Sequence, residues 1–255
     1  MSSALTDASA ELVRDLVDAN HILYQQGVVD AFGHVSARHD RDAGRFLLAR
    51  NMAPARVGAQ DIVQYAVATG EPLASDAPRG YLERCIHSEI YKARPDVMAV
   101  VHNHSPAVLP FCIARGVRLQ PVCHMAGFLG GADAPQGPTL FEIRDHAGAA
   151  SDLLIRSREL GAALARTLGS ARVVLMRGHG CTVVAPSLRV AVFRAVYTEV
   201  NAKLLLGSLP LGEVVTLTPE EADATRITNE GQVTRPWDLW REQALQARSQ
   251  PDPAT

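Results

Sequence analysis

Several features that would mark the class of a protein at once are scarce or missing in this sequence. Its 255 residues include four cysteines without a Cys-x-x-Cys pair, and aromatic residues make up 5% of the chain. A disulfide framework or a zinc site built on paired cysteines is therefore not expected. We interpret the four thiols, at Cys85, Cys112, Cys123 and Cys181, as small buried apolar groups of a cytoplasmic protein.

Neither charge sign dominates, and no long hydrophobic run occurs. The chain carries 25 Lys and Arg against 27 Asp and Glu, a net charge of −2, which argues against a polybasic surface for nucleic acid. No apolar run approaches the roughly 18 residues that a membrane helix needs. Residues 1–7 lack the basic start and apolar core of a secretory signal. We expect a cytoplasmic protein that binds neither nucleic acid nor membrane.

Common catalytic and nucleotide-binding motifs are missing as well. The sequence has no phosphate-binding Gly-x-x-x-x-Gly-Lys-Ser/Thr loop, no Gly-x-Gly-x-x-Gly after a strand, no Gly-x-Ser-x-Gly and no His-Glu-x-x-His. Nine histidines are present, and several follow apolar segments. The search for a functional site therefore begins with the histidines.

Helical and strand patterns alternate along the whole chain, with no linker between them. Apolar spacing, caps and glycine or proline stops predict helices over residues 7–26, 80–94, 151–168 and 187–206, and a further helix after Thr218. Strands are predicted over residues 32–38, 45–49, 97–101 and 172–176. This order indicates one α/β domain over residues 1–255, with a mixed or antiparallel sheet and a frayed tail at 248–255.

Two histidines stand two positions apart at the end of the predicted strand 97–101. Residues at that spacing on a strand point to the same face, so His102 and His104 would present two imidazoles side by side, which suits two ligands of one cation. Two histidines that make hydrogen bonds at a strand end are the alternative. His179 lies between two glycines after another apolar strand, where a close approach to a site or a simple turn would each explain the glycines.

A carboxylate and a histidine share one face of the predicted helix over 80–94. Glu83 and His87 are four residues apart, so Glu83 could be a fourth ligand or a general base, or only a solvated side chain. Three neutral imidazoles and a carboxylate would fit a divalent metal ion such as Zn, Mn, Fe or Co.

Four segments together resemble the class II aldolase/adducin family. They are Gly-His-Val-Ser-Ala-Arg at 33–38, Glu-Arg-Cys-Ile-His at 83–87, the run 94–104 that ends in His-Asn-His, and Arg-Gly-His-Gly at 177–180. The resemblance extends over about residues 8–240. It implies an α/β/α sandwich with a mixed or antiparallel central sheet. It also implies a homotetramer with active sites at subunit interfaces.

The resemblance also implies roles for the residues singled out above. His102, His104 and His179 match the family's metal ligands, with one divalent ion per subunit. Glu83 matches the acid/base carboxylate, which can also contact the metal. These enzymes use the metal to stabilise an enediolate or a similar carbanion.

The sequence departs from the family's sugar-phosphate aldolases where those enzymes bind phosphate. His34, Arg50 and Tyr81 stand in the three altered segments, and the tyrosine that a neighbouring subunit contributes falls at Met125, beside His124. We interpret His34, Arg50, Tyr81 and His124 as contacts to a planar, anionic substrate, because an arginine fork matches a carboxylate.

This pattern is most similar to the family's metal-dependent decarboxylases of hydroxylated aromatic or heteroaromatic dicarboxylates, such as dihydroxyphthalate decarboxylase. We therefore expect a metal-dependent carbon–carbon lyase that decarboxylates such an acid. The alternatives are an aldolase acting on a sugar phosphate or sugar acid, a non-haem iron oxygenase of a hydroxyaryl acid, and a non-catalytic adducin-like interaction protein. The presence of all three histidines and Glu83 disfavours the last.

Overall fold

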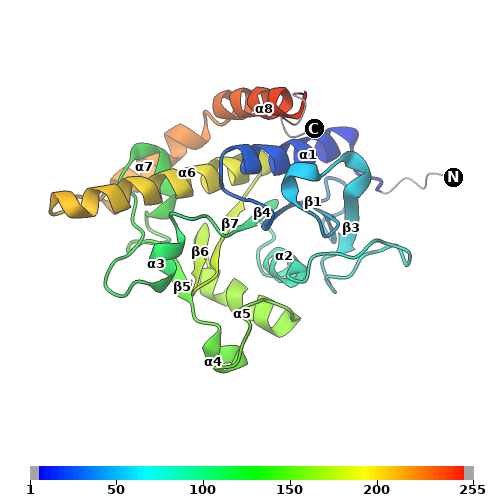
Figure 1. Ribbon diagram of the computed structural model, residues 1–255, viewed down its shortest axis with the longest axis horizontal. Coiled ribbons are helices and arrows are strands. Elements are labelled where there is room, and N and C mark those ends of the chain that lie inside the picture. The colour runs from blue at the N-terminus through cyan, green and yellow to red at the C-terminus, as the bar shows by residue number, and fades with distance from the viewer. Residues whose placement is uncertain (1–5, 250–255) are drawn as a thin grey trace, which may run out of the picture.

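Seven strands form one mixed sheet in the computed structural model, which describes residues 6–249 (Figure 1). In chain order they are β1 His34–Arg38, β2 Arg45–Ala49, β3 Ile62–Ala66, β4 Ala99–Asn103, β5 Thr139–Phe141, β6 Val173–Met176 and β7 Gly180–Ala185. Their order across the sheet is β3-β2-β1-β4-β7-β6-β5, and all neighbours are antiparallel except β5 and β6. The predicted mixed sheet is confirmed.

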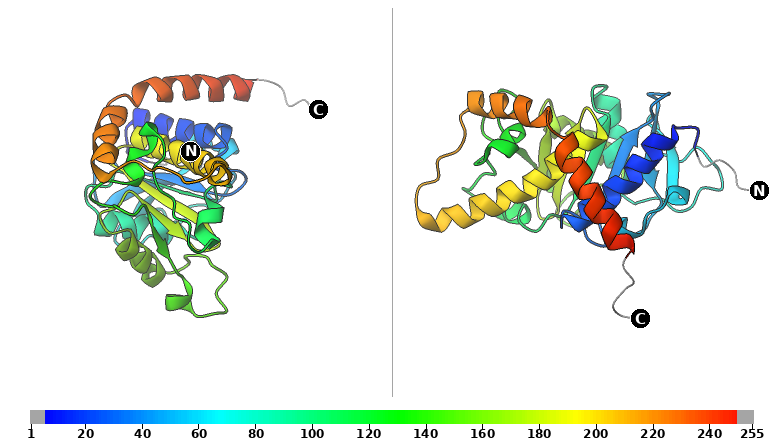
Figure 2. Two further views of the ribbon diagram at one scale, coloured as in Figure 1. Left: turned by 90° about the vertical axis from the view of Figure 1, so that its left-hand side faces the viewer. Right: turned by 90° about the horizontal axis from the view of Figure 1, so that it is seen from above.

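Helices cover both faces of this sheet. They are α1 Ala10–Gln25, α2 Arg84–Ala93, α3 Leu109–Ile113, α4 Arg144–Ala147, α5 Arg158–Leu168, α6 Leu188–Ser208, α7 Pro219–Glu230 and α8 Thr234–Ser249, with 3-10 turns η1 Pro54–Arg56, η2 Ala59–Asp61, η3 His124–Leu129 and η4 Leu209–Leu211. Figure 2 shows α1 and α6 above the sheet, α2 and α5 below it, and α8 outside α1 and α6. This arrangement is the predicted α/β/α sandwich.

The central strands β1, β4 and β7 are buried at every position. Because helices cover both faces, these strands contain near-continuous apolar or hydrogen-bonded residues. In the β1–β4 register, His34 lies directly opposite His102, so both side chains stand on one face of the sheet. The centre of the sheet therefore carries polar groups on the side covered by α2.

Two of the predicted helix starts are confirmed with their caps. The Ser187 hydroxyl accepts a hydrogen bond from the amide of Val190 and opens α6, which continues through Gly207 to Ser208. Thr218 and Glu221 form a capping box at the start of α7, with Pro219 as its first helical residue. Both starts combine a side-chain acceptor with good helix formers, so the local sequence is sufficient to predict where these two helices begin.

The helix predicted over 151–168 is wrong in its first part. Residues 148–157 form a loop, and α5 begins at Arg158 with Ser157 as its cap. Leu153 has a φ of 69°, a left-handed conformation that no helix interior allows. The loop stays outside the helix because its backbone groups hydrogen-bond to the side chains of the site described below.

Other boundaries shift by a few residues. The strand predicted at 97–101 is displaced to 99–103, and the helix predicted from residue 80 begins at Arg84, so Glu83 is its N-cap. The sequence did not predict β3, β5, β7, α3, α4 or α8. Of the tail expected to fray, Arg248 and Ser249 belong to α8, and the remainder, like residues 1–5, lies outside the described residues. None of the helices in residues 6–249 combines the length and hydropathy of a membrane span.

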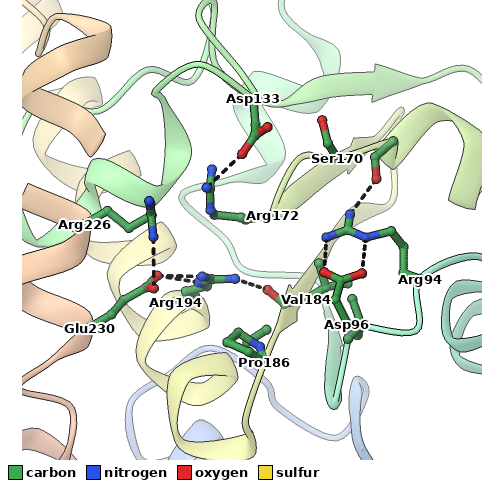
Figure 3. A pocket seen from close by; sticks show the side chains of 13 residues that line it. Arg94, Asp96, Asp133, Ser170, Arg172, Val184, Pro186, Arg194, Arg226 and Glu230 are labelled. Atoms are coloured by element: carbon green, nitrogen blue, oxygen red, sulfur yellow. Dashed lines mark hydrogen bonds and ion pairs between the residues drawn. The ribbon is translucent and has the colours of Figure 1, made fainter. Parts of the chain in front are cut away.

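Ion pairs surround a cavity of about 570 Å³ at the ends of β6 and β7 that lie away from their connecting turn (Figure 3). The pairs are Arg94 with Asp96, Arg172 with Asp133, and both Arg194 and Arg226 with Glu230. Each of these guanidinium groups has a carboxylate partner. The ion pairs around the cavity therefore link α6, α7 and the sheet.

Candidate metal centre and active site

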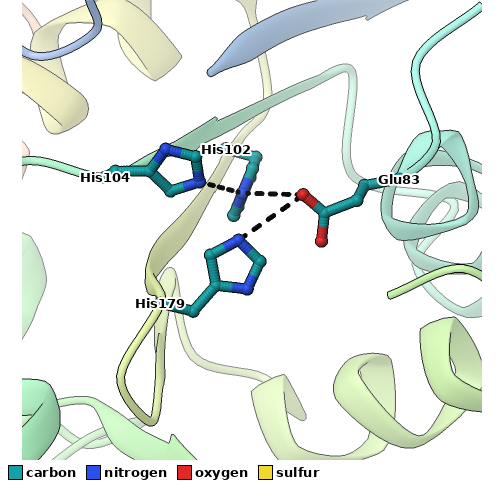
Figure 4. Close-up of side chains that lie close together, drawn as sticks. All are labelled: Glu83, His102, His104 and His179. Atoms are coloured by element: carbon teal, nitrogen blue, oxygen red, sulfur yellow. Dashed lines mark hydrogen bonds and ion pairs between the residues drawn. The ribbon is translucent and has the colours of Figure 1, made fainter. Parts of the chain in front are cut away.

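Three histidines and one glutamate converge beside the sheet (Figure 4). One ligand atom from each of Glu83, His102, His104 and His179 lies within 4.8 Å of all the others. The four residues come from the cap of α2, the end of β4, the segment after β4 and the turn between β6 and β7. We call this group the histidine cluster.

The end of β4 delivers the first two imidazoles. His102 is the fourth residue of β4 and has no exposed surface, and His104 follows the end of the strand. Their Nε2 atoms lie 3.1 Å apart, so the two rings point at one position, as the sequence predicted. The Thr182 hydroxyl lies 3.3 Å from Nδ1 of His102 and so orients that ring from the neighbouring strand.

A glycine-flanked turn brings His179 to the same place. Gly180 has a φ of 150°, and a Cβ there would overlap the carbonyl oxygen of Asn103. The missing side chain lets the turn lie directly against the end of β4. The ring centroids of His179 and His102 are consequently 4.9 Å apart, and those of His179 and His104 are also 4.9 Å apart.

The loop before α5 holds both His179 and Glu83. Nδ1–H of His179 donates to the Leu153 carbonyl at 2.9 Å, which leaves the Nε2 lone pair directed at the cluster. The amide of Ile155 donates to Oε1 of Glu83, also at 2.9 Å. Oε2 of Glu83 then lies 3.6 Å from Nε2 of His102 and 3.5 Å from Nε2 of His179.

The electrostatics of the cluster keep the carboxylate ionised. Burial alone would raise the pKa of Glu83, but His102, His179 and the Ile155 amide lower it to about 2. Burial holds the pKa of His102 well below its usual range. Burial also lowers the pKa of His104, whereas at His179 the Glu83 carboxylate outweighs burial and raises the pKa. His102 and His104 therefore offer neutral imidazole lone pairs beside one anionic oxygen, and metal binding would require His179 to be neutral as well.

The donor set fits a divalent metal ion. Nε2 of His179 is buried and has no hydrogen-bonding partner among the described residues, although unpaired buried nitrogens are costly. The Nε2 atoms of His102 and His104 face each other, and a shared cation would satisfy both lone pairs. Three imidazoles and a carboxylate suit Zn, Mn, Fe or Co. These four residues could hold such an ion.

Two of the predicted substrate contacts adjoin the cluster. The ring centroid of His34 is 5.0 Å from that of His102 and 4.7 Å from that of Tyr81. The Tyr81 hydroxyl donates to the carbonyl of Met52 at 2.7 Å, and burial raises its pKa to about 12, so it remains a neutral phenol. His34 and Tyr81 thus form an aromatic wall next to His102.

The other two predicted contacts make no hydrogen bond to the cluster among residues 6–249, although Arg50 lies near enough to Tyr81 to lower the pKa of its hydroxyl. Nε of Arg50 donates to Asp61 at 2.6 Å, in a side chain that is 43% exposed and keeps both terminal nitrogens free of that bond. His124 opens η3 and contacts Asn229 of α7. No hydrogen bond or ring contact among residues 6–249 joins His124 to the histidine cluster.

His87 has a different environment from the one its spacing suggested. It lies one turn after Glu83, but its ring is bound by His34 and Ser36 instead of facing the cluster, and burial lowers its pKa to about 3. The sequence reasoning missed the roles of Ser36, Leu153 and Ile155. For Ser36 the period of two in β1 was an available signal, since it places Ser36 on the same face as His34.

The chain belongs to the class II aldolase/adducin family, whose profile, described as the class II aldolase and adducin N-terminal domain, matches residues 14–206. Decarboxylase tropJ of Talaromyces stipitatus is 38% identical over 248 residues, which are 89% of this chain and 92% of that protein. The 3,4-dihydroxyphthalate decarboxylase of Arthrobacter keyseri is 30% identical over 251 residues, 94% of this chain and 95% of that protein.

A solved structure supports the same fold. The L-fuculose 1-phosphate aldolase of Glaciozyma antarctica superposes with a TM-score of 0.72 at 18% identity, over 98% of this chain and 97% of that one. At this identity the likeness concerns the fold alone. The profile match and the two relatives confirm the family predicted from the four sequence segments.

Proposed function

We propose that the protein is a metal-dependent decarboxylase of a hydroxylated aromatic or heteroaromatic dicarboxylate. The observation that carries the proposal is the histidine cluster beside an aromatic wall of His34 and Tyr81. The names of two relatives support it, because one is called a decarboxylase and the other acts on 3,4-dihydroxyphthalate. Our expectation of a carbon–carbon lyase agrees with these names.

His102, His104, His179 and Glu83 would hold the metal ion, which we take to be Zn, Mn, Fe or Co. When bound, such an ion supplies a positive charge that stabilises the negative charge left as a carbon–carbon bond breaks. The residues around it would bind and orient the acid. Tyr81 would bound the ring, while His34 and the terminal nitrogens of Arg50 would bind the carboxylate that is retained.

Decarboxylation replaces a carboxylate with a proton at one carbon. The bond to the carboxyl carbon breaks, CO₂ leaves, and the electron pair that remains takes up a proton. We assign the movement of this proton to Glu83, whose Oε2 is directed into the cluster while the Ile155 amide holds Oε1 in place. The ionised carboxylate would accept the proton of the substrate's ring hydroxyl and pass it to the carbon that CO₂ leaves, and water would then return a proton to the ring oxygen. A glutamine at this position would keep the size and the contact with Ile155 and lose the proton acceptor.

The proposal includes a homotetramer in which a neighbouring subunit completes each site. The position of His124, on η3 and away from its own cluster, fits a residue that reaches the site of another copy. We place the enzyme in the cytoplasm, in keeping with its four free cysteines.

The test measures the metal content of protein purified without chelators and then the products formed from candidate acids. We expect one divalent ion per subunit and CO₂ from a hydroxylated aromatic dicarboxylate such as 3,4-dihydroxyphthalate. Glu83→Gln should retain the ion and lose roughly 10²- to 10⁴-fold in kcat, the usual contribution of general acid–base catalysis. An aldehyde from a sugar phosphate without CO₂ from any aryl acid would establish an aldolase, and uptake of O₂ would establish an oxygenase.

A further inference from the structure

A chain of buried hydrogen bonds leads from the aromatic wall into the protein core. Nδ1 of His34 lies 2.7 Å from Nε2 of His87, and Nδ1 of His87 lies 2.6 Å from the Ser36 hydroxyl oxygen. The Ser36 hydroxyl lies 2.8 Å from the hydroxyl of Tyr91. The four side chains are at most 5% exposed, so water does not compete for these contacts.

The side-chain spacing along β1 and along α2 explains how this series of hydrogen bonds forms. His34 and Ser36 are two apart on β1 and share a face of the sheet. His87 and Tyr91 are four apart on α2 and share a face of that helix. Packing these two faces together places the four polar groups in alternation, strand to helix and back.

Only one arrangement of protons gives every buried donor an acceptor. The Tyr91 hydroxyl has Ser36 as its one side-chain partner among residues 6–249, so its proton is donated to Ser36. The Ser36 proton then goes to Nδ1 of His87, the remaining side-chain partner of that hydroxyl. With Nδ1 as an acceptor, the neutral His87 ring carries its proton on Nε2 and donates it to Nδ1 of His34.

The reverse direction of donation leaves one proton unpaired at the Tyr91 end of this series of hydrogen bonds. If Nδ1 of His34 donated to His87, and His87 donated to Ser36, the Ser36 proton would go to Tyr91. The Tyr91 proton would then be buried without an acceptor in the described part of the chain. An unsatisfied buried hydroxyl costs about 1–3 kcal/mol, which favours the first direction.

We infer that Tyr91, Ser36 and His87 are positioning residues that fix His34 in the tautomer with its proton on Nε2. This nitrogen makes no hydrogen bond to another residue among residues 6–249, so its proton is available to a ligand. His34 is therefore a committed hydrogen-bond donor beside His102. If the proposed function holds, the Nε2–H group of His34 donates a hydrogen bond to the retained carboxylate of the substrate, a group that can only accept.

The tautomer can be measured directly in zinc-loaded, full-length protein. With ¹⁵N-labelled histidine, the protonated and the bare ring nitrogens give well-separated ¹⁵N signals, and the His34 and His87 signals are assigned from their absence in His34→Gln and His87→Gln. We expect bare Nδ1 and protonated Nε2 in both rings. A bare Nε2 in His34 of the wild type would refute the inference, whatever the protein turns over.

A pair of variants tests whether His87 acts through His34. His87→Gln keeps an N–H group that can donate to His34, whereas His87→Met has similar length and no donor. The probe is phthalate, an aromatic dicarboxylate without a hydroxyl group, titrated by calorimetry. We expect His87→Gln to bind phthalate within a few-fold of wild type and His87→Met to bind it roughly 10- to 100-fold more weakly, the effect of losing a hydrogen bond to a charged group.

His21→Met serves as the control. His21 is also buried, but it hydrogen-bonds to the Val57 carbonyl and does not belong to this series of hydrogen bonds. It should bind phthalate like the wild type. Equal binding by the two His87 variants would contradict a positioning role. The inference and the proposed function can fail separately: the ¹⁵N signals decide the tautomer, and CO₂ release decides the reaction.

Discussion

Among single residues, His104 has the most clearly separable role. It lies beyond the end of β4, outside the ladder of backbone hydrogen bonds, and presents its Nε2 to that of His102. His104→Ala should leave the sheet folded and weaken zinc binding by more than the roughly 10- to 100-fold that loss of an outer-shell partner costs. Zinc titration with circular dichroism on the same samples measures both. His124→Ala is the control, and full-affinity zinc binding by His104→Ala would remove His104 from the site.

Arg50 offers a second test at this scale. Its Nε is held by Asp61, which leaves the two terminal nitrogens able to bind a carboxylate. Arg50→Met should lower kcat/KM for dicarboxylates by roughly 30- to 150-fold, or about 2–3 kcal/mol, and affect monocarboxylates much less. Steady-state kinetics with both substrate classes measure this. Arg56→Met, which lines the same surface cavity, should have little effect, and an equal loss for both classes would exclude Arg50 as the clamp.

At the scale of elements, the turn between β6 and β7 should be the most sensitive segment. Gly180→Ala puts a Cβ against the Asn103 carbonyl and 3.0 Å from the His104 Cα, at a φ of 150°. We expect a loss of about 1–3 kcal/mol in the free energy of unfolding from the backbone conformation, together with weaker zinc binding as His179 moves away. Denaturant unfolding and zinc titration check both.

Gly212→Ala is the matched control, because Gly212 also has a positive φ, of 128°, but no atom within 4 Å of an added Cβ. It should lose stability and keep zinc affinity. If the two variants bind zinc equally, the close approach of the turn to β4 does not position His179.

The same elements show what the sequence could and could not predict. His102, His104 and His179 were found because their signals are local: a spacing of two on a strand and a pair of flanking glycines. The loop over 148–157 was assigned to a helix because Ser151 is a good cap, whereas the contacts of Leu153 with His179 and of Ile155 with Glu83 join segments far apart in the chain. Such tertiary contacts override local propensity and leave no periodic trace.

For the whole molecule, the position of His124 allows a test of the assembly. In a ring of subunits, a site that takes its metal ligands from one copy and His124 from the next requires both copies to be intact at those positions. His104→Ala and His124→Ala should each be inactive alone. Mixed at equal amounts under conditions that let subunits exchange, they should form tetramers in which about one quarter of the sites combine an intact His104 with a neighbour's intact His124.

Recovery of activity in that mixture, with light scattering at the mass of four chains, would place His124 in its neighbour's site. His104→Ala mixed with Glu83→Gln is the control. Each of these variants carries a damaged histidine cluster within its own subunit, so no exchange of subunits can produce an intact one. Activity that stays absent in the first mixture, despite exchange shown by tagged subunits, would mean that each subunit builds its site alone. The exposed His124 would then serve only the contact of η3 with Asn229 of α7.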